Sequence, residues 1–331
     1  MSTTRVVRFH EAGKAKVLKI EKEEIPQLKD DEILLKVSAI GLNRAEVAFR
    51  AGQYLEDPEF PSGLGYEASG TIEAMGSGVK GFKKGDKVST IPAFSMKEYG
   101  VYGEKVVVPK HATTKYPENL SEEEATSIWM QYLTSYGALV EIGNLKAGQS
   151  VLITAASSSV GMASIQIAKA IGATAIATTR KKDKKQDLLD AGADHVIVTD
   201  DENLVERAME ITKNKGVNLL FDPITGPIVN DLANAAAQGG IIIEYGMLSS
   251  KETPFPFMEV LSKQLTIRGY VLFEITTNPE SLKKAKDFVF EKLKSGELKP
   301  IIDKTFKFDD IVEAHEYMES NQQKGKIVVT V

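Results

Sequence analysis

The chain of 331 residues contains no cysteine. This absence excludes disulfide bonds, thiolate catalysis and every zinc site that is built on sulfur. Histidine is also scarce, and no two of the four histidines stand at the short spacing of neighbouring metal ligands. We therefore expect no metal site, although a site assembled from distant His and carboxylate residues would leave no local motif.

Long apolar runs are missing as well. The first twenty residues have no apolar core of signal-peptide length, and no stretch approaches the ~18 apolar residues of a membrane span. The net charge of −5 argues against binding to nucleic acid or to an anionic membrane. With 42% hydrophobic and 26% charged residues, the composition is that of an ordinary globular protein, for which we expect a cytoplasmic location.

The pattern of apolar residues changes along the chain. Up to about residue 120, short alternating strands stand between Gly-rich turns, which is typical of an antiparallel barrel or sandwich. Beyond that point, β-branched apolar runs alternate with helical patterns, which indicates a parallel sheet with helices on both faces. We therefore expect an α/β protein with an antiparallel barrel or sandwich in its first part and a doubly wound parallel sheet after it, followed from about residue 265 by mixed segments that could fold back onto the first domain.

One strand-to-helix turn has the context of a nucleotide loop; it reads TAASSSVGMASIQ and spans residues 154–166. An overlay of the pattern G-x-G-x-x-G places Ala156, Ser158 and Gly161 at the glycine positions, and all three side chains are small. A helix N-terminus with added serine hydroxyls offers hydrogen-bond donors to a phosphate. The alternative is that the serines only cap the helix. The loop alone does not decide between the two.

The next strand ends in cations, in the sequence TTRKKDKK, where an acid is typical of proteins that bind a free ribose 2′-hydroxyl. A 2′-phosphate requires cations, and Arg180 and Lys184 are suited to this task. The alternative is a solvated basic start of a helix. Cations at a helix N-terminus oppose the helix dipole, however, and a bound phosphate would offset that cost. The pattern favours NADPH over NADH.

A set of glycines and acids in the first half of the chain, together with the cofactor loop and the terminal GKIVVTV, resembles a known family. The set comprises Gly65, Glu67, Gly70, Gly85 and Asp86. The chain is similar over nearly its whole length to the medium-chain dehydrogenase/reductases, and within them to the zinc-independent quinone oxidoreductase branch. The resemblance implies a GroES-like β-barrel catalytic domain over residues 1–124, a Rossmann domain over residues 125–265 that binds NADP, and a tail, residues 266–331, that returns to complete the catalytic domain.

The same resemblance implies site residues. Zinc-dependent relatives place Cys and His where this chain has Asn43 and Tyr66, so no catalytic zinc is expected. Asn43 and Tyr54 match positions near the nicotinamide and the substrate, although Asn43 could support a turn and Tyr54 could be an ordinary loop aromatic. Ser158 and Ser159 replace two glycines of the relatives, which would strain a loop that needs left-handed backbone. The candidate cofactor-binding residues are Thr134, Ala156, Ser157, Ser158, Ser159, Val160, Gly161, Thr179, Arg180, Lys184 and Gly246.

These observations predict an NADPH-dependent reductase that transfers a hydride to a small electrophilic substrate, either a quinone or a conjugated enone or enal. Hydrogen bonds from Tyr54 and Asn43 would meet the charge that develops on the acceptor oxygen. Three alternatives stay open: an alcohol dehydrogenase-like enzyme, an enoyl-thioester reductase and a non-catalytic nucleotide-binding protein. The resemblance also implies a homodimer joined through the edges of its Rossmann sheets, and no nucleic-acid or membrane partner is expected.

Overall fold

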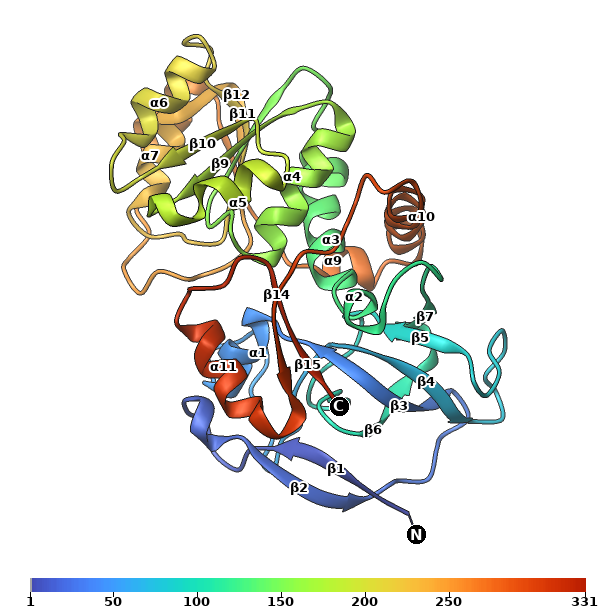
Figure 1. The fold of residues 1–331 in the computed structure, drawn as a ribbon. Helices are drawn as coiled ribbons and strands as arrows, with labels where there is room; N and C mark the ends of the chain where they lie inside the picture. The colour runs from blue at the N-terminus through green and yellow to red at the C-terminus, as the bar shows by residue number, and fades with distance from the viewer. Residues whose placement is uncertain (1) are drawn as a thin grey trace. The chain divides into compact units, whose positions relative to one another are not determined.

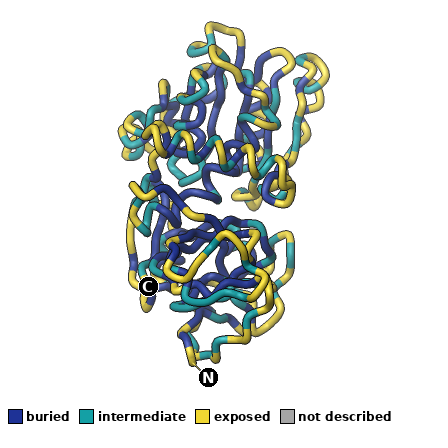
Figure 2. Tube along the Cα trace, turned by 90° about the vertical axis from the view of Figure 1, so that its right-hand side faces the viewer, coloured by how far each residue is buried: buried dark blue, intermediate teal, exposed yellow. Residues whose placement is uncertain are grey.

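The computed structural model describes residues 2–331, which divide into two compact units. Unit 1 contains the residues up to Met130 together with Pro300–Val331, and unit 2 contains Gln131–Lys299. In both units, buried stretches of the chain lie inside and exposed turns lie at the periphery (Figure 2). Within residues 2–331, no helix has both the length and the apolar character that a membrane span requires.

Unit 1 is built on a seven-stranded sheet and a separate two-stranded antiparallel ribbon (Figure 1). Its strands are β1 (Thr3–Arg8), β2 (Lys19–Glu24), β3 (Glu32–Gly41), β4 (Glu67–Met75), β5 (Lys87–Thr90), β6 (Lys105–Pro109), β7 (Thr113–Lys115), β14 (Ile302–Lys307) and β15 (Lys326–Thr330). Its helices are α1 (Arg44–Arg50), α2 (Glu122–Ala125) and α11 (Ile311–Glu319), with 3-10 turns at Ala15–Val17, Lys110–Ala112 and Phe308–Asp310. The sheet order is β14-β15-β3-β4-β5-β7, and β6 also pairs with β3.

Strand β3 lies at the centre of this sheet and leads directly into the candidate site. It pairs with β4 along one edge and with β6 and β15 along the other, so most of its side chains are buried. At its end, a Cβ on Gly41 would lie 2.2 Å from the Thr126 carbonyl oxygen and 2.8 Å from Lys326 Cε. Only glycine leaves room for this close approach of three chain segments. The chain then turns through Asn43 into α1.

Unit 2 contains a six-stranded parallel sheet in the order β10-β9-β8-β11-β12-β13. Its strands are β8 (Ser150–Ile153), β9 (Thr174–Thr179), β10 (His195–Val198), β11 (Val217–Asp222), β12 (Ala236–Glu244) and β13 (Thr266–Gly269). Its helices are α4 (Ser159–Ile171), α5 (Lys185–Asp190), α6 (Leu204–Ile211), α7 (Ile228–Ala235), α8 (Phe257–Lys263), α9 (Phe273–Thr276) and α10 (Pro279–Ser295), with a 3-10 turn at Lys182–Lys184. Helix α3 (Trp129–Tyr136) continues into a π-helix at Gly137–Ile142 and enters this unit.

The strand order fixes where unit 2 can bind a ligand. From β8 the chain proceeds to β9 and β10 on one side and then crosses to β11 on the other. In open parallel sheets, ligands bind at the carboxyl ends of the strands, at the point where the order reverses. Here that point lies between the ends of β8 and β11. Apolar side chains of β8, β9 and β11 form the core beneath it with α6 and α7.

The α/β class, with antiparallel strands in the first unit and a doubly wound parallel sheet in the second, is confirmed. The structure places the return of the chain to unit 1 at Pro300, later than the expected residue 266. The reason is that β13 pairs with β12 and that Phe288 of α10 packs its ring on Tyr136, which keeps both segments in unit 2.

Candidate functional site

The serine-rich turn connects the buried strand β8 to the N-terminus of α4. Ser158 is the N-cap of the helix, and its hydroxyl accepts a hydrogen bond from the Gly161 N–H at 3.0 Å. The first turn of α4 carries no acidic side chain. A Cβ on Gly161 would lie 2.5 Å from the backbone of Ala156, so glycine is required for the helix to pack closely on the strand. This end of α4 is therefore suited to an anion.

The serines of the turn adopt no left-handed backbone. Ser158 has φ −72° and ψ 162°, which is extended, and the helix begins at Ser159. The positive φ of the turn, 44°, is found at Ala155. The strain expected from serines at glycine positions is therefore absent, because the tight turn precedes them by three residues.

The end of β9 lies next to this turn. The Ala156 N–H donates to the Thr178 carbonyl at 3.3 Å, and Lys184 Nζ donates to the Ser157 hydroxyl at 3.2 Å. Thr179 ends the strand and is buried, whereas Arg180 is exposed and has no ion pair with a described acid. Lys182, by contrast, pairs with Asp201 at 3.2 Å. One cation, Lys184, thus contacts the turn, and a second, Arg180, directly follows the strand end that pairs with it.

Two further segments contact the same turn. Tyr245 follows β12, stacks on Phe221 with ring centroids 4.0 Å apart, and hydrogen-bonds Ser158. The next residue, Gly246, is exposed, and a Cβ there would lie 2.9 Å from Pro223. On the other side, Ser135 of α3 donates to the Val160 carbonyl at 3.1 Å, one residue after the buried Thr134. The cofactor candidates of unit 2 therefore surround one end of its sheet.

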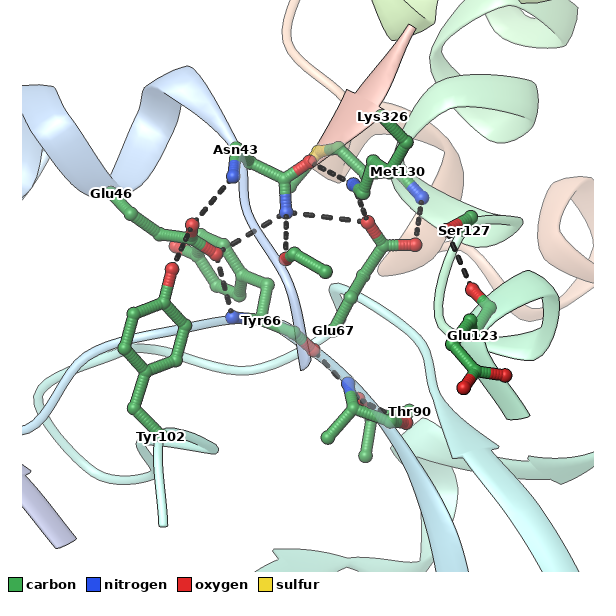
Figure 3. Close-up of polar contacts among 12 residues, drawn as sticks. Asn43, Glu46, Tyr66, Glu67, Thr90, Tyr102, Glu123, Ser127, Met130 and Lys326 are labelled. Atoms are coloured by element: carbon green, nitrogen blue, oxygen red, sulfur yellow. Dashed lines mark hydrogen bonds and ion pairs between the residues drawn. The ribbon is translucent and has the colours of Figure 1, made fainter. Parts of the chain in front are cut away.

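The candidate residues of unit 1 belong to a buried polar network (Figure 3). The Asn43 side chain is fully engaged: its amide nitrogen donates to Gly41 O, Glu46 Oε1 and Glu67 Oε2 at 3.1–3.2 Å, and its oxygen accepts from Lys326 Nζ at 2.6 Å. Lys326 also pairs with Glu67 at 2.5 Å, and both side chains are at most 1% exposed. Asn43 thus links the start of α1 to β4 and β15.

Glu46 is the centre of this network. Its carboxylate accepts from the backbone N–H groups of Asn43 at 2.6 Å and Tyr66 at 3.1 Å, and from the Tyr102 hydroxyl at 2.7 Å (Figure 3). Burial nevertheless raises the pKa of Glu46. The sequence pattern Asn-x-x-Glu explains the first contact, since a Glu three residues after the N-cap commonly binds the N-cap N–H.

Beyond Tyr102 the network reaches the surface through His315 and Arg50. Arg50 Nη1 lies 2.9 Å from His315 Nδ1, and His315 Nε2 lies 3.3 Å from the Tyr102 hydroxyl. Because arginine only donates, Nδ1 accepts and the ring proton sits on Nε2. Burial and the nearby Arg50 lower the pKa of His315 to about 3, so the ring is neutral at pH 7. Arg50 pairs with the partly exposed Glu319 at 2.6 Å.

Tyr54 lies on the loop after α1. Its ring packs edge-on against Phe49 with centroids 6.3 Å apart, and its hydroxyl hydrogen-bonds that of Tyr66. Glu56, two residues on, fixes this loop by accepting from the Ser95 hydroxyl at 2.5 Å and the Met96 N–H at 3.0 Å. Burial raises the pKa of Tyr54, so its hydroxyl is protonated at pH 7 and can donate.

Several of these partners were not expected from the sequence. Glu46 could have been found by its spacing from Asn43. Two further acids of unit 2, Asp222 at the end of β11 and Glu244 at the end of β12, each close an apolar strand, which is a recognisable signal for the carboxyl edge of a sheet. Lys326 and His315 gave no local signal, because their partners are more than 200 residues away in the chain.

No group of three or more His, Cys, Asp or Glu side chains in residues 2–331 is arranged to hold a metal ion. At the positions where zinc-dependent relatives carry ligands, Asn43 is saturated by protein partners and Tyr66 lies against Tyr54. The residues at these two positions therefore do not fit a zinc ion.

Comparisons with known proteins agree with this architecture. The quinone oxidoreductase of Pongo abelii is 30% identical over 328 residues, which cover 98% of this chain and 97% of that protein. The crystal structure of Escherichia coli quinone oxidoreductase complexed with NADPH matches with a TM-score of 0.90 and 29% identity over the whole of both chains. A crystal structure described as an NAD-dependent alcohol dehydrogenase matches with a TM-score of 0.89 and 28% identity over 99% of each chain.

Two family models also match the chain. Residues 29–118 match the alcohol dehydrogenase GroES-like domain, and residues 159–291 match a family described as zinc-binding dehydrogenase. The first lies within unit 1 and the second within unit 2. The resemblance inferred from the sequence is thereby confirmed: the chain belongs to the medium-chain dehydrogenase/reductase superfamily, in its quinone oxidoreductase branch.

Proposed function

We propose that the protein is an oxidoreductase that binds NADPH at the carboxyl edge of unit 2 and reduces a quinone or another conjugated carbonyl compound. The observation that carries the proposal is that the end of β9 next to the α4 turn carries cations and no acid. Lys184 contacts Ser157, Arg180 has no acidic partner among the described residues, and no acid ends β9. The NADPH complex of the Escherichia coli relative supports the same cofactor.

Different residues of unit 2 would bind different parts of the cofactor. The turn from Ala156 to Gly161 would hold the pyrophosphate with N–H and hydroxyl donors, because it precedes a helix with no acid in its first turn. Arg180 and Lys184 would bind the 2′-phosphate through charge-assisted hydrogen bonds. Thr134, Thr179 and Gly246 would complete the contacts. When bound, NADPH supplies the hydride from its nicotinamide ring.

The residues of unit 1 would stabilise the charge that develops on the acceptor oxygen. Tyr54 is the stronger candidate, since its hydroxyl is protonated at pH 7. The two amide hydrogens of Asn43 already face three protein oxygens, so an acceptor would have to compete for them. We therefore assign the direct donation to Tyr54 and the positioning of the site to Asn43.

An acceptor panel tests this assignment. NADPH oxidation, followed at 340 nm, should be rapid with quinones, enones or enals and slow with simple aldehydes and enoyl-thioesters. Tyr54→Phe should lower kcat by about 10²-fold, the typical cost of one lost donor to an oxyanion, without changing the NADPH Kd. The matched control is Tyr317→Phe, which removes a tyrosine hydroxyl that donates to Asp303. Turnover of simple aldehydes alone would favour an alcohol dehydrogenase, a reading supported by one of the structural relatives. Tight NADPH binding without turnover would favour a non-catalytic protein.

We also propose that the protein forms a homodimer through β13. This strand pairs with β12 on one side only, and the segments before it expose large apolar side chains. They are Met247, Leu248, Phe255, Phe257, Met258 and Leu261. Light scattering after size-exclusion chromatography should give twice the chain mass, and Met258→Lys with Leu261→Glu should give the monomer. A monomeric wild type contradicts this proposal.

The cytoplasmic location expected from the composition stays a prediction.

A further inference from the structure

Two acids end adjacent strands at the carboxyl edge of unit 2. Asp222 is the last residue of β11, Glu244 is the last residue of β12, and the two are register partners in this parallel pair. Side chains at partnered positions of neighbouring strands project on the same face of a sheet. The two carboxyl groups therefore lie side by side, close to the turn before α4.

Asp222 accepts a hydrogen bond at each of its two carboxyl oxygens. Thr154, at the end of β8, donates its hydroxyl to Oδ1, and the Thr225 N–H donates to Oδ2 at 2.6 Å. The side chain is fully buried. The Asp222 carboxyl group is therefore fixed in place by two hydrogen-bond donors of unit 2.

Glu244 is in the opposite situation. Both of its carboxyl oxygens are buried, and no N–H or O–H donor in residues 2–331 reaches them. Its neighbour on β13 is Gly269, which has no side chain, and the adjacent Arg268 pairs with Glu274 at 2.5 Å. The charged group that faces Glu244 is thus Asp222. A buried carboxylate without a donor, next to a second carboxylate, is costly unless it takes up a proton.

A shared proton satisfies both groups. Protonated Glu244 donates to Asp222, and Asp222 has lone pairs to accept this bond besides those from Thr154 and Thr225. In agreement, burial and the neighbouring Asp222 raise the pKa of Glu244 to about 9.

We propose that Glu244 is a positioning residue of the nucleotide site, which stays protonated at neutral pH, donates a hydrogen bond to Asp222, and thereby limits this pair of acids to one negative charge. The inference rests on the proposed function, because it concerns the binding of an anionic dinucleotide at this edge. A second charge there would repel the cofactor phosphates, and the low polarity of the site would strengthen the repulsion.

The first test measures NADPH Kd from pH 7 to pH 10 by fluorescence titration. For the wild type, Kd should be constant to about pH 8 and should then rise several-fold more steeply than for Glu244→Gln, whose amide donates without ionising. Groups elsewhere titrate equally in both proteins, so the difference isolates Glu244. The control Glu210→Gln, on an exposed part of α6, should follow the wild type. Superimposable pH profiles for wild type and Glu244→Gln would overturn the proposal.

The second test needs no cofactor. Between pH 4.5 and about 9, the unfolded chain ionises Glu244 while the folded protein keeps it protonated, so this residue lowers stability progressively as pH rises. The Tm of Glu244→Gln should therefore exceed that of the wild type by an amount that is near zero at pH 4.5 and grows to pH 9. Asp222→Asn removes the charge next to Glu244. The Tm of this variant should therefore fall less between pH 4.5 and pH 9 than the Tm of the wild type. Parallel Tm curves for wild type and both variants would overturn the proposal.

Absence of NADPH binding to the wild type at pH 7 would instead reject the proposed function and leave this second test intact.

Discussion

The charged groups of unit 1 and unit 2 differ in how completely they are paired. In unit 1, Lys326 is held by Glu67 and Asn43, and Arg50 is held by Glu319 and His315. In unit 2, Arg180 is exposed without an acidic partner, and the Glu244 carboxyl oxygens receive no N–H or O–H donor from the described residues. Charged groups whose partners all lie within the protein stabilise one structure. Charged groups that lack such partners are able to respond to a ligand or to pH. We therefore infer that the network of unit 1 positions the residues of the site, whereas the carboxyl edge of unit 2 binds the ligand.

The largest effect is expected from breaking the network of unit 1 at Lys326. Lys326→Met leaves Glu67 buried without its cation, which should lower the free energy of unfolding by about 3–5 kcal/mol. Trp129, the sole tryptophan, is buried in unit 1 and donates to the Ser89 hydroxyl at 2.9 Å, so its fluorescence in guanidinium reports on this unit. The control Lys87→Met removes a solvent-exposed pair with Glu122 and should cost less than about 1 kcal/mol. Equal losses in the two variants would contradict the role of the buried pair.

The second effect concerns the cations of unit 2. Arg180→Ala combined with Lys184→Ala should weaken NADPH binding by about 100-fold, or about 2.7 kcal/mol, because two charge-assisted hydrogen bonds are lost. Binding of NADH, which lacks the 2′-phosphate, should change little. The matched control is Lys182→Ala with Lys185→Ala, which removes two cations of the same segment, one of them already paired with Asp201. Similar losses for NADPH and NADH would show that these cations do not read the 2′-phosphate.

A third effect follows from the neutral His315 in unit 1. Its pKa is lowered from 6.5 to about 3, so the unfolded chain takes up a proton below pH 6.5 that the folded protein refuses. Stability should therefore fall as pH decreases from 6.5 towards 3, by about 2 kcal/mol at pH 5 from this group alone. The side chain of His315→Gln can accept from Arg50 and donate to Tyr102 but does not titrate. The free energy of unfolding of this variant should therefore fall by about 2 kcal/mol less than that of the wild type between pH 7 and pH 5. Unfolding followed by Trp129 at pH 7 and pH 5 measures the difference, and identical declines would rule out this origin.

The smallest effect is expected at the cap of α4. Ser158→Ala removes the acceptor of the Gly161 N–H and should destabilise the first turn by about 1 kcal/mol, whereas Ser158→Gly should cost only a few tenths. Hydrogen exchange of the amides at the start of α4 measures this loss. Ser159→Ala, at the first helical position, should leave the exchange rates unchanged. If Ser158→Ala behaves like Ser159→Ala, Ser158 does not cap the helix in solution.

Sequence reasoning succeeded where the signal is local. The turn before α4 was recognisable from small residues between an apolar strand and an apolar helix, and the cations follow the next strand directly. It failed where partners meet only through the fold. Lys326 reaches Asn43 across 283 residues, and Glu244 gains its neighbour Asp222 only because β11 and β12 pair in parallel. The backbone of the turn also required the structure, since nothing in the residue types indicates that Ala155 takes the positive φ in place of the serines.

The central claim is that the carboxyl edge of unit 2 recognises the 2′-phosphate of NADPH. The most direct measurement is the Kd of the wild-type protein for NADPH and for NADH under the same conditions, by fluorescence titration or calorimetry. We expect NADPH to bind at least about tenfold more tightly, a difference of about 1.4 kcal/mol or more. Equal affinities, or tighter binding of NADH, would contradict the account.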